Sequence, residues 1–584
     1  MANQPTTPET RPGAQLFVRL GLSTAILLAS TTHAFTFSHG DLEGSFTSQL
    51  SIGSSWRLEA PSDALISSGN GGSAPSNTSD DGNANFERGD AFSRIFKGVH
   101  ELELNYQNYG AFIRGKYWYD AALKDDKRPH GNITNGYQSD EPLSDKGFSK
   151  AARFSGAQLL DAFIYGEFEI QEMPLDLRLG NQVVSWGEST FIQGGINSIN
   201  PFDVSAFRRP GAEIKEGLLP VPMVYGALAA SDNLTIEGFY QLQWRKTEID
   251  GCGTYFSSAD WAASGCRGLA FAATIPDATN IAAGTVVQRA SDDTPDNQGQ
   301  YGLATRYYAE SLDTEIGAYY LNYHSRLPYV SVIRSTMGAH PATPVGSPGF
   351  DGQYQVVYPE DVELYGLSFA TNVSNWALSG EASHRPNLPA QLNGNDLLLA
   401  GVTDGIAPTA FSPYLQQTAP GQSAAGFRRM AVSQAQLTAI GFFDQILGAS
   451  RMTVIGELGA VQVHNRDRKL RFGRNTVFGS GATGDDGYMT DSSWGYRLRG
   501  VLDYPNAVAG INLKPNLSFS HDVRGYSPSP AQQFQQGRKA LGLTLNADYL
   551  STYNGGLSYT RYFGGQYNEI SDRDFVAINV GLSF

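Results

Sequence analysis

The sequence predicts an all-β protein: a transmembrane, antiparallel β-barrel of the outer-membrane type with about 18 strands. Three observations predict this fold. Long segments alternate apolar and polar residues, short and long connections alternate between them, and the chain ends in an apolar strand whose last residue is Phe584. The composition agrees, because aromatic residues are 11% and charged residues only 17% of the chain, whereas roughly a quarter of a soluble domain is charged.

The N-terminus has the features of an export signal. Arg11 and Arg19 give it positive charge, and a short apolar run at Leu20–Ser30 precedes a possible small-residue cleavage site. This run is shorter than the ~20 residues with which a helix spans a bilayer. We therefore expect residues 1–34 to be a signal peptide and residues 35–584 to be the exported barrel.

The first strand that the alternation predicts runs from Leu42 to Leu58. Its even positions are mostly apolar, as at Phe46, Ile52 and Trp56, and its odd positions are polar or small. Because side chains alternate between the faces of a strand, one face is apolar and the other polar. Strands of soluble sheets are much shorter, at ~5–6 residues. The pattern recurs at Leu234–Trp244, Trp494–Tyr504, Lys539–Tyr549 and Asn554–Phe563.

The connections between strands alternate in length, as in outer-membrane barrels, which have short periplasmic turns and long external loops. The short turns are expected at Gln107–Tyr109, Gln171–Met173, Ser231–Asn233, Asn372–Asn375, Pro505–Ala509 and Leu550–Tyr553. The long loops are expected at Ala60–Ile95, Ala121–Gly156, Gly187–Gly217, Thr247–Gln298, Leu327–Glu360, Pro386–Phe427, Asn465–Thr490 and Val523–Gln536.

The C-terminal strand resembles that of Gram-negative outer-membrane proteins, which ends in an aromatic residue. Stepping back by two from Phe584 gives Leu582, Val580 and Ile578, with small or polar residues between them. The resemblance implies that Phe584 is an assembly signal for the barrel-assembly machinery. Tyrosines and tryptophans near strand ends fit either aromatic girdles or ordinary strand propensity. They are Tyr106, Tyr109, Tyr117, Trp118, Tyr119, Trp244, Tyr307, Tyr308, Tyr319, Tyr320, Tyr323, Tyr504, Tyr549 and Tyr562.

Basic residues recur on the polar strand faces, which line the lumen of such a barrel. Carboxylates share these faces, among them Glu237, Glu381 and Glu457. Opposed charges could form a selectivity surface or could simply fill the lumen. The basic residues expected on the lumen wall are Arg114, Lys116, Arg178, Arg245, Arg306, Arg497, Arg499 and Arg561.

The stretch Arg178–Pro222 is unusually apolar for a loop, and it is rich in Gly, Asn and Pro. We expect residues 187–217 to fold into the lumen as a constriction, with an external loop packed on its neighbours as the alternative. Asn200 is expected to cap a helix that begins at Pro201. Loop charges are expected to pair with the wall charges Arg178, Arg245 or Arg497. The residues expected to form the constriction are Trp186, Glu188, Asn200, Asp203, Arg208 and Arg209.

The two cysteines, Cys252 and Cys266, lie in one long loop and predict a disulfide in an oxidising compartment. No histidine lies near them in the sequence, so a metal pair is disfavoured. Short acidic runs such as Asp80-Asp81 lack the full ligand spacing of a calcium loop and are interpreted as solvated. We expect no metal, no cofactor and no catalytic residue, since Gly-x-Ser-x-Gly is absent and the nine histidines show no paired spacing.

The chain resembles an uncharacterised proteobacterial outer-membrane family, the domain of unknown function thirteen-oh-two. The motifs that carry the resemblance are Asn85–Asp90, the Gly180–Pro222 block with Ser185–Ser189 at its centre, Tyr323–Arg326 with Pro328, Gly380-Glu381, His384–Asn387 and Ser520–Val523. The resemblance implies the outer membrane of a Gram-negative bacterium. It also implies periplasmic or inner-membrane transport components as partners, because members often accompany exporters of the resistance-nodulation-division type.

These observations favour a channel or transporter for small hydrophobic or amphipathic compounds. The alternatives are a general hydrophilic porin and a barrel enzyme of the lipase or protease type. The apolar loop favours the first reading, the lumen arginines favour the porin, and no catalytic constellation favours the enzyme. Outer-membrane lipid and lipopolysaccharide are the expected surroundings. With 57 acidic and 42 basic residues the net charge is −15, so nucleic acid is not an expected partner.

Overall fold

The computed structural model describes residues 35–270, 272–336, 351–480 and 486–584. The predicted signal peptide, residues 1–34, lies outside the described residues. Eighteen strands form the barrel: β2 (Leu42–Arg57), β3 (Ala91–Tyr106), β4 (Tyr109–Asp120), β7 (Ser155–Ile170), β8 (Met173–Gln182), β9 (Val221–Ser231), β10 (Leu234–Gln241), β13 (Tyr301–Ala309), β14 (Thr314–Tyr323), β17 (Val362–Val373), β18 (Trp376–Gln391), β20 (Phe427–Asp444), β21 (Arg451–His464), β22 (Ser492–Val508), β23 (Ile511–Arg524), β24 (Lys539–Tyr549), β25 (Tyr553–Phe563) and β26 (Phe575–Ser583).

Each of these strands pairs antiparallel with the next along the chain, and β2 closes the ring by pairing with β26 from Gln49↔Ser583 to Arg57↔Phe575. The short strand β1 (Phe35–His39) pairs with the start of β2, beyond the point where β26 ends. Phe584 continues the closure, because its N–H donates to the Ser48 carbonyl at 2.9 Å. The predicted antiparallel barrel and its strand number are therefore confirmed.

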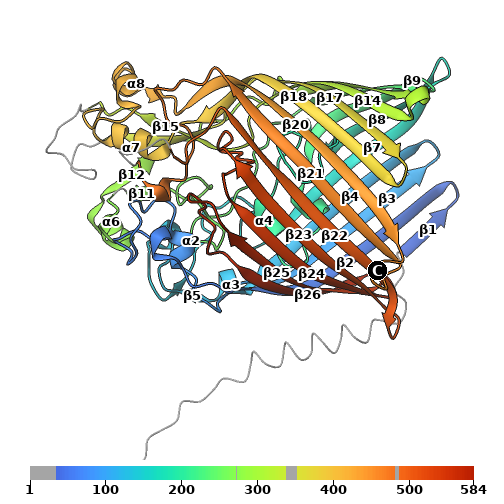
Figure 1. Cartoon of the computed structure of the whole chain (residues 1–584), viewed down its shortest axis with the longest axis horizontal. Coiled ribbons are helices and arrows are strands. Elements are labelled where there is room, and N and C mark those ends of the chain that lie inside the picture. Colours follow the sequence, from blue (N-terminus) through green and yellow to red (C-terminus); the bar gives the residue numbers. More distant parts are fainter. Residues whose placement is uncertain (1–34, 271, 337–350, 481–485) are drawn as a thin grey trace, which may run out of the picture.

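The two ends of the barrel differ, as the connection lengths predict. The short turns and the C-terminus lie at one end, and the long loops gather at the other (Figure 1). Several predicted boundaries agree closely, such as Lys539–Tyr549 for β24. Others do not: β10 ends at Gln241, three residues before the predicted Trp244. The sequence reading also missed the turns at 310–313 and 445–450 and the loop at 564–574.

The strand faces divide as the alternation predicts. Large apolar side chains such as Ile52, Leu367 and Leu437 are 48–62% exposed on the outer face. The neighbouring positions face inward and are polar or small. The predicted girdle residues Trp118, Tyr319, Tyr323 and Tyr562 instead face the interior. Trp118 and Tyr319 are only 3% and 5% exposed, because they contact a loop inside the barrel.

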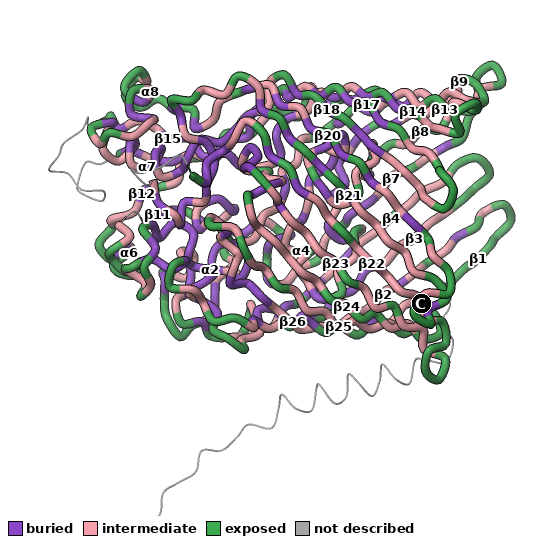
Figure 2. Tube along the Cα trace, viewed as in Figure 1, coloured by how far each residue is buried: buried purple, intermediate pink, exposed green. Residues whose placement is uncertain are grey.

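The long loops form a cap with its own core, visible as the buried part of the chain at the loop end (Figure 2). Its strands are β5 (Lys127–Arg128), β6 (Glu141–Pro142), β11 (Leu269–Ala270), β12 (Val286–Arg289), β15 (Tyr329–Ile333), β16 (Gln353–Val357) and β19 (Ser423–Ala424). Most of the short helices lie in this cap: η1 (Asp63–Leu65), α2 (Asp81–Ala84), α3 (Ala121–Lys124), η2 (Ile133–Asn135), α6 (Asp277–Ala283), α7 (Gly394–Val402), α8 (Ser412–Gln416) and η4 (Thr476–Phe478). The others are α4 (Val204–Arg208) and α5 (Ile214–Gly217) between β8 and β9, and η3 (Glu310–Leu312) in a turn.

Among the described helices, none combines the length and the apolar character needed to cross a bilayer. Two sequence expectations are wrong in the cap. Asp80 and Asp81 are fully buried rather than solvated, since neighbouring loops pack over them. Arg245 lies in the loop after β10 rather than on the barrel wall, because the strand ends before it.

Candidate constriction and lumen

Residues 183–220, here called the inward segment, connect β8 to β9 and lie within the barrel. The inward faces of β18, β20 and β21, here called the covered wall, hold its first half. The Glu381 carboxylate on β18 accepts the backbone N–H groups of Glu188 at 2.6 Å, Ser189 at 3.2 Å and Ile196 at 2.9 Å. Because Glu381 is 5% exposed, these charge-assisted bonds form away from bulk water.

A second carboxylate on the covered wall binds the next three backbone N–H groups of the inward segment in the same way. Glu457 on β21 accepts N–H groups from Thr190 at 2.8 Å and from Phe191 and Ile192 at 2.7 Å each. Gly195 passes so close to the wall that a Cβ there would lie 1.8 Å from Glu381 Oε1. Only glycine fits at this approach, which explains why the segment is glycine-rich at this point.

The second half of the inward segment binds the opposite side of the barrel. Lys97 on β3 contacts Glu216 at 2.5 Å, and Lys116 on β4 contacts Asp203 at 2.7 Å. In the strand order, β4 and β20 are nine positions apart in a ring of eighteen. The segment therefore crosses the lumen from one side to the other, and the alternative of a purely external loop is wrong.

Each residue predicted for the constriction lies in this segment, but its contacts differ from those expected. The Trp186 indole donates to Glu237 at 2.7 Å and is 1% exposed. Asn200 does not cap a helix; its side chain exchanges hydrogen bonds with the backbone of Val184. The cap is Asp203, which accepts from Ala206 N at 3.0 Å at the start of α4.

The predicted ion pairs between the segment and Arg178, Arg245 or Arg497 are wrong. Glu188 instead lies 3.8 Å from Arg306, and Arg208 pairs with Asp250 at 3.0 Å. Arg209 lies over the ring of Trp118 at 4.6 Å. The strand pattern predicts which face of the barrel wall a charge lies on. It does not predict where along the barrel axis the inward segment passes that charge.

The other predicted wall charges are mostly bound to wall neighbours. Arg114 pairs with Glu101 at 2.9 Å and Asp161 at 2.7 Å. Arg306 joins Glu237 and Glu315. Arg178 lies over the ring of Tyr225, Arg245 donates to the Pro220 carbonyl, and Arg497 pairs with Asp522. The prediction for Arg561 is wrong: it is in register with Leu541, on the strand face that carries the exposed Leu543 and Leu557, so it lies on the outer face, 3.7 Å from Asp574.

Arg499 is different from these residues. Within the described ranges no carboxylate pairs with it, and its Nε has no hydrogen-bond partner. It lines a cavity of about 350 Å³ between Phe191 of the inward segment and the inner faces of β22–β25. Small polar side chains of these strands, such as Asn516, Ser518 and Thr560, line the same cavity, together with Arg497 and Tyr562.

The inner faces of β22–β26 and β2, here called the open wall, also carry mostly small or polar side chains. Register pairs such as Gly542↔Thr560, Gly556↔Asn579 and Asn579↔Gly53 place small or amide side chains next to one another. Pro210 and Gly211 of the inward segment approach this wall near Gly53 and Asn579. The remainder of the open wall is partly exposed, so solvent reaches the lumen on this side.

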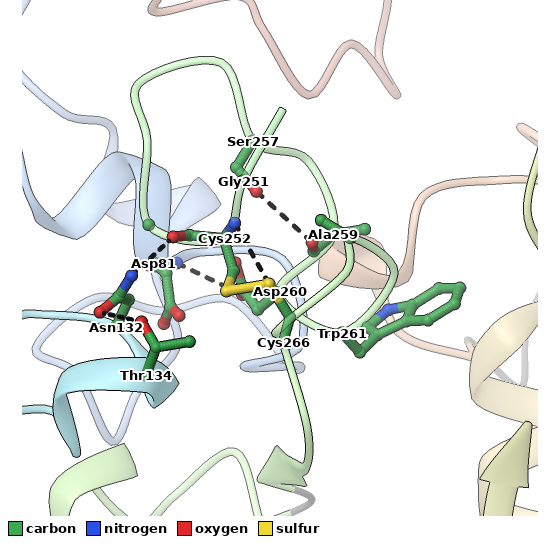
Figure 3. The surroundings of a disulfide bond; sticks show 12 residues. Asp81, Asn132, Thr134, Gly251, Cys252, Ser257, Ala259, Asp260, Trp261 and Cys266 are labelled. Atoms are coloured by element: carbon green, nitrogen blue, oxygen red, sulfur yellow. Dashed lines mark hydrogen bonds between the residues drawn. A yellow bond between two sulfur atoms is a disulfide. The ribbon is translucent and has the colours of Figure 1, made fainter. Parts of the chain in front are cut away.

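Sequence reasoning placed Glu381 and Glu457 on polar strand faces but missed their role in holding the inward segment. A signal was available: a buried carboxylate needs donors, and a Gly- and Asn-rich loop offers free backbone N–H groups. Cys252 and Cys266 are joined in a disulfide within the cap (Figure 3).

The fold and the inward segment together define a transmembrane β-barrel of the outer-membrane type whose lumen is crossed by one of its own loops. The chain belongs to the family described as "Protein of unknown function (DUF1302)", whose model matches residues 16–584. The predicted family is thereby confirmed. No curated protein matches the chain.

The chain is similar over most of its length to several solved structures. Acinetobacter baumannii OccAB3 is 9% identical with a TM-score of 0.41, over 93% of this chain and 99% of that chain. Pseudomonas aeruginosa OccK2 (OpdF), in complex with glucuronate, is 8% identical with a TM-score of 0.38, over 93% and 97%. Pseudomonas aeruginosa OccD3 (OpdP) is 10% identical with a TM-score of 0.39, over 95% and 94%.

Proposed function

We propose that the protein is a channel in the outer membrane of a Gram-negative bacterium and that it passes small amphipathic anions. The observation that carries the proposal is the asymmetry of the lumen: the inward segment fills the side of β18, β20 and β21 and leaves a polar cavity along β22–β25. The apolar outer face of such a barrel is stable only in contact with lipid. Lipopolysaccharide and the barrel-assembly machinery are its proposed partners.

The lining supports amphipathic rather than wholly apolar substrates. Ile196 and Ile199 of the inward segment are 0% and 1% exposed and pack against the wall, whereas Phe207 and Ile214 are 39% and 72% exposed, so the segment offers only part of its apolar surface to the lumen. The proposed path, which runs through the cavity along β22–β25, presents the Phe191 ring and the unpaired guanidinium of Arg499. An aromatic ring binds apolar carbon, and a guanidinium binds a carboxylate or phosphate.

The test is electrical. Purified, folded protein inserted into planar bilayers is expected to give small, steady current steps with a reversal potential that shows anion preference in a salt gradient. A wide hydrophilic porin would instead give large steps with weak selectivity. Silence from protein that is folded, as judged by heat-modifiable gel mobility, would contradict the channel.

A further inference from the structure

A buried cluster of aspartates in the cap has no part in the proposed channel. Asp80 and Asp81 come from the loop between β2 and β3, and Asp260 and Asp277 come from the loop between β10 and β13. Three of the four side chains are fully buried, and Asp260 is 4% exposed. In the described part of the chain their one ion-pair partner is His130, which lies 3.0 Å from Asp81 and 3.5 Å from Asp277. One histidine cannot balance four carboxylates.

The four carboxylates are not equally satisfied. Asp277 accepts hydrogen bonds from Asn70 at 2.6 Å and from Asn77 at 2.7 Å. By contrast, Asp80 and Asp260 each bury an oxygen, Oδ1, that no described residue contacts as a donor. An ionised oxygen without a partner is strongly unfavourable in a protein interior, so each of these two oxygens needs either a proton or a cation as its partner.

The unsatisfied oxygens belong to one group. Asp80, Asp81 and Asp260 each offer a carboxylate oxygen, and the three oxygens lie within 4.8 Å of one another. Burial, followed by repulsion from the neighbouring carboxylates, raises the pKa of Asp80 and of Asp260, and burial raises the pKa of Asp81 to about 7. A positive charge among the three carboxylates would relieve both effects.

We propose that Asp80, Asp81 and Asp260 bind one Ca²⁺ ion. The donor set selects the metal: Ca²⁺ takes many oxygen ligands in flexible geometry, Mg²⁺ keeps its waters and uses one or two carboxylates, and Zn²⁺ favours nitrogen and sulfur. Asn77 also buries an amide oxygen without a described partner, and amide oxygens are calcium ligands. This site does not depend on the proposed channel function.

The ion would join two loops that are far apart in sequence. Asp260 lies between Cys252 and Cys266, so the disulfide closes the loop that presents it, and Asp81 lies beside it from the other loop (Figure 3). The two loops already meet directly, since Asp81 N donates to Asp260 Oδ2 at 3.4 Å and Asp260 N donates to the Thr78 carbonyl at 3.1 Å, but neither contact neutralises the carboxylates. Calcium binding would therefore hold the β2–β3 loop against the disulfide-closed loop.

The first experiment measures binding to the full-length barrel in detergent. After treatment with a chelator, terbium is added and its luminescence is excited through tyrosine, because the Tyr137 hydroxyl lies 3.1 Å from Asp81. We expect saturation at one terbium per chain and displacement by Ca²⁺ at lower concentration than by Mg²⁺. Absence of saturable luminescence, or equal displacement by Mg²⁺, would overturn the proposal.

The second experiment compares two carboxylate-to-amide variants. Asp260→Asn removes one ligand charge and should weaken terbium affinity about tenfold or more. Asp396→Asn is the matched control, because Asp396 is also a buried cap carboxylate but pairs with Arg471 at 2.6 Å; it should leave terbium affinity unchanged. Equal affinities in the two folded variants would overturn the proposal, and so would calcium-free elemental analysis of native protein prepared in calcium. Bilayer conductance plays no part in either readout.

Discussion

The covered wall and the open wall begin from the same sequence pattern and end in opposite roles. Both are inward faces of long amphipathic strands with polar residues at alternate positions. On the covered wall, Gln436 and Glu457 are 6% and 2% exposed because they bind backbone groups of the inward segment. On the open wall, Ser518 and Asn579 remain partly exposed. Strand alternation therefore predicts which face is the lumen but not which part of the lumen stays open.

Chemistry distinguishes the two walls better than polarity does. The covered wall carries carboxylates and carboxamides, which accept or donate several hydrogen bonds and so can bind an irregular backbone. The open wall carries small hydroxyl, amide and glycine residues together with Arg497, which pairs with Asp522, and Arg499. In the proposed channel, the first set immobilises the segment and the second set lines the path.

Deleting Gly194–Phe207 and joining the ends with a short Gly-Ser linker should change the single-channel conductance more than any other variant. The deletion removes the part that crosses the lumen while Glu457 still binds residues 190–192. Single-channel conductance should rise several-fold, and cells should become sensitive to bulky antibiotics. Heat-modifiable mobility checks that the barrel still assembles. Unchanged conductance in an assembled variant would refute the constriction.

Replacing both Glu381 and Glu457 by Gln should change the channel current less than the deletion does, but measurably. The two carboxylates accept six backbone N–H groups, and hydrogen bonds to charged groups contribute about 1.5–3 kcal/mol each. We expect noisy current with frequent transitions to a larger conductance. Glu103→Gln is the control, because Glu103 binds Tyr165 at 3.1 Å rather than the segment. If the control behaves like the double variant, the noise is not due to release of the segment.

Arg499→Gln should change selectivity and leave the size of the current steps nearly unchanged. One unpaired charge near a watery path acts through a high effective dielectric, so we expect about 1 kcal/mol or less, seen as a few-fold fall in the anion-to-cation permeability ratio. The measurement is the reversal potential in a salt gradient. Arg429→Gln, at the end of β20 near the loops, is the control; an equal shift in both variants would argue against a selective role for Arg499.

Removing the disulfide with Cys252→Ala and Cys266→Ala should have the smallest effect on the lumen. The disulfide closes a loop of fourteen residues in the cap, and loops of this size gain about 3 kcal/mol in the chain-entropy model. Limited proteolysis should cut the chain between these positions faster than in the native protein, at unchanged conductance. A change in conductance would show that the cap controls the path.

The barrel was predictable because its physical causes are local and repeated. Alternation in strands such as Lys539–Tyr549 and turns such as 107–109 need no knowledge of distant residues, so their boundaries agree with the structure within a residue or two. The inward position of 187–217 was also predictable from its apolar content. Its partners were not, because Lys116 and Glu457 reach it only through closure of the ring.

The cap shows the limit of sequence reasoning most clearly. Asp80-Asp81 is a short acidic run, and on sequence grounds a solvated loop explains it. Burial arises because residues far along the chain pack against it, among them His130, Tyr137 and Asp260. A ligand set assembled from two loops has no fixed spacing in the sequence, unlike a continuous calcium-binding loop.

The central claim is that the path runs along the open wall and not along the covered wall. Cysteine accessibility tests it most directly, in a background that lacks Cys252 and Cys266. Ser518→Cys and Gln436→Cys place one thiol on each wall, and a charged methanethiosulfonate reagent is added during bilayer recording. The account predicts a stepwise loss of current for Ser518→Cys and no change for Gln436→Cys. Equal block of both variants, or block of Gln436→Cys alone, would contradict it.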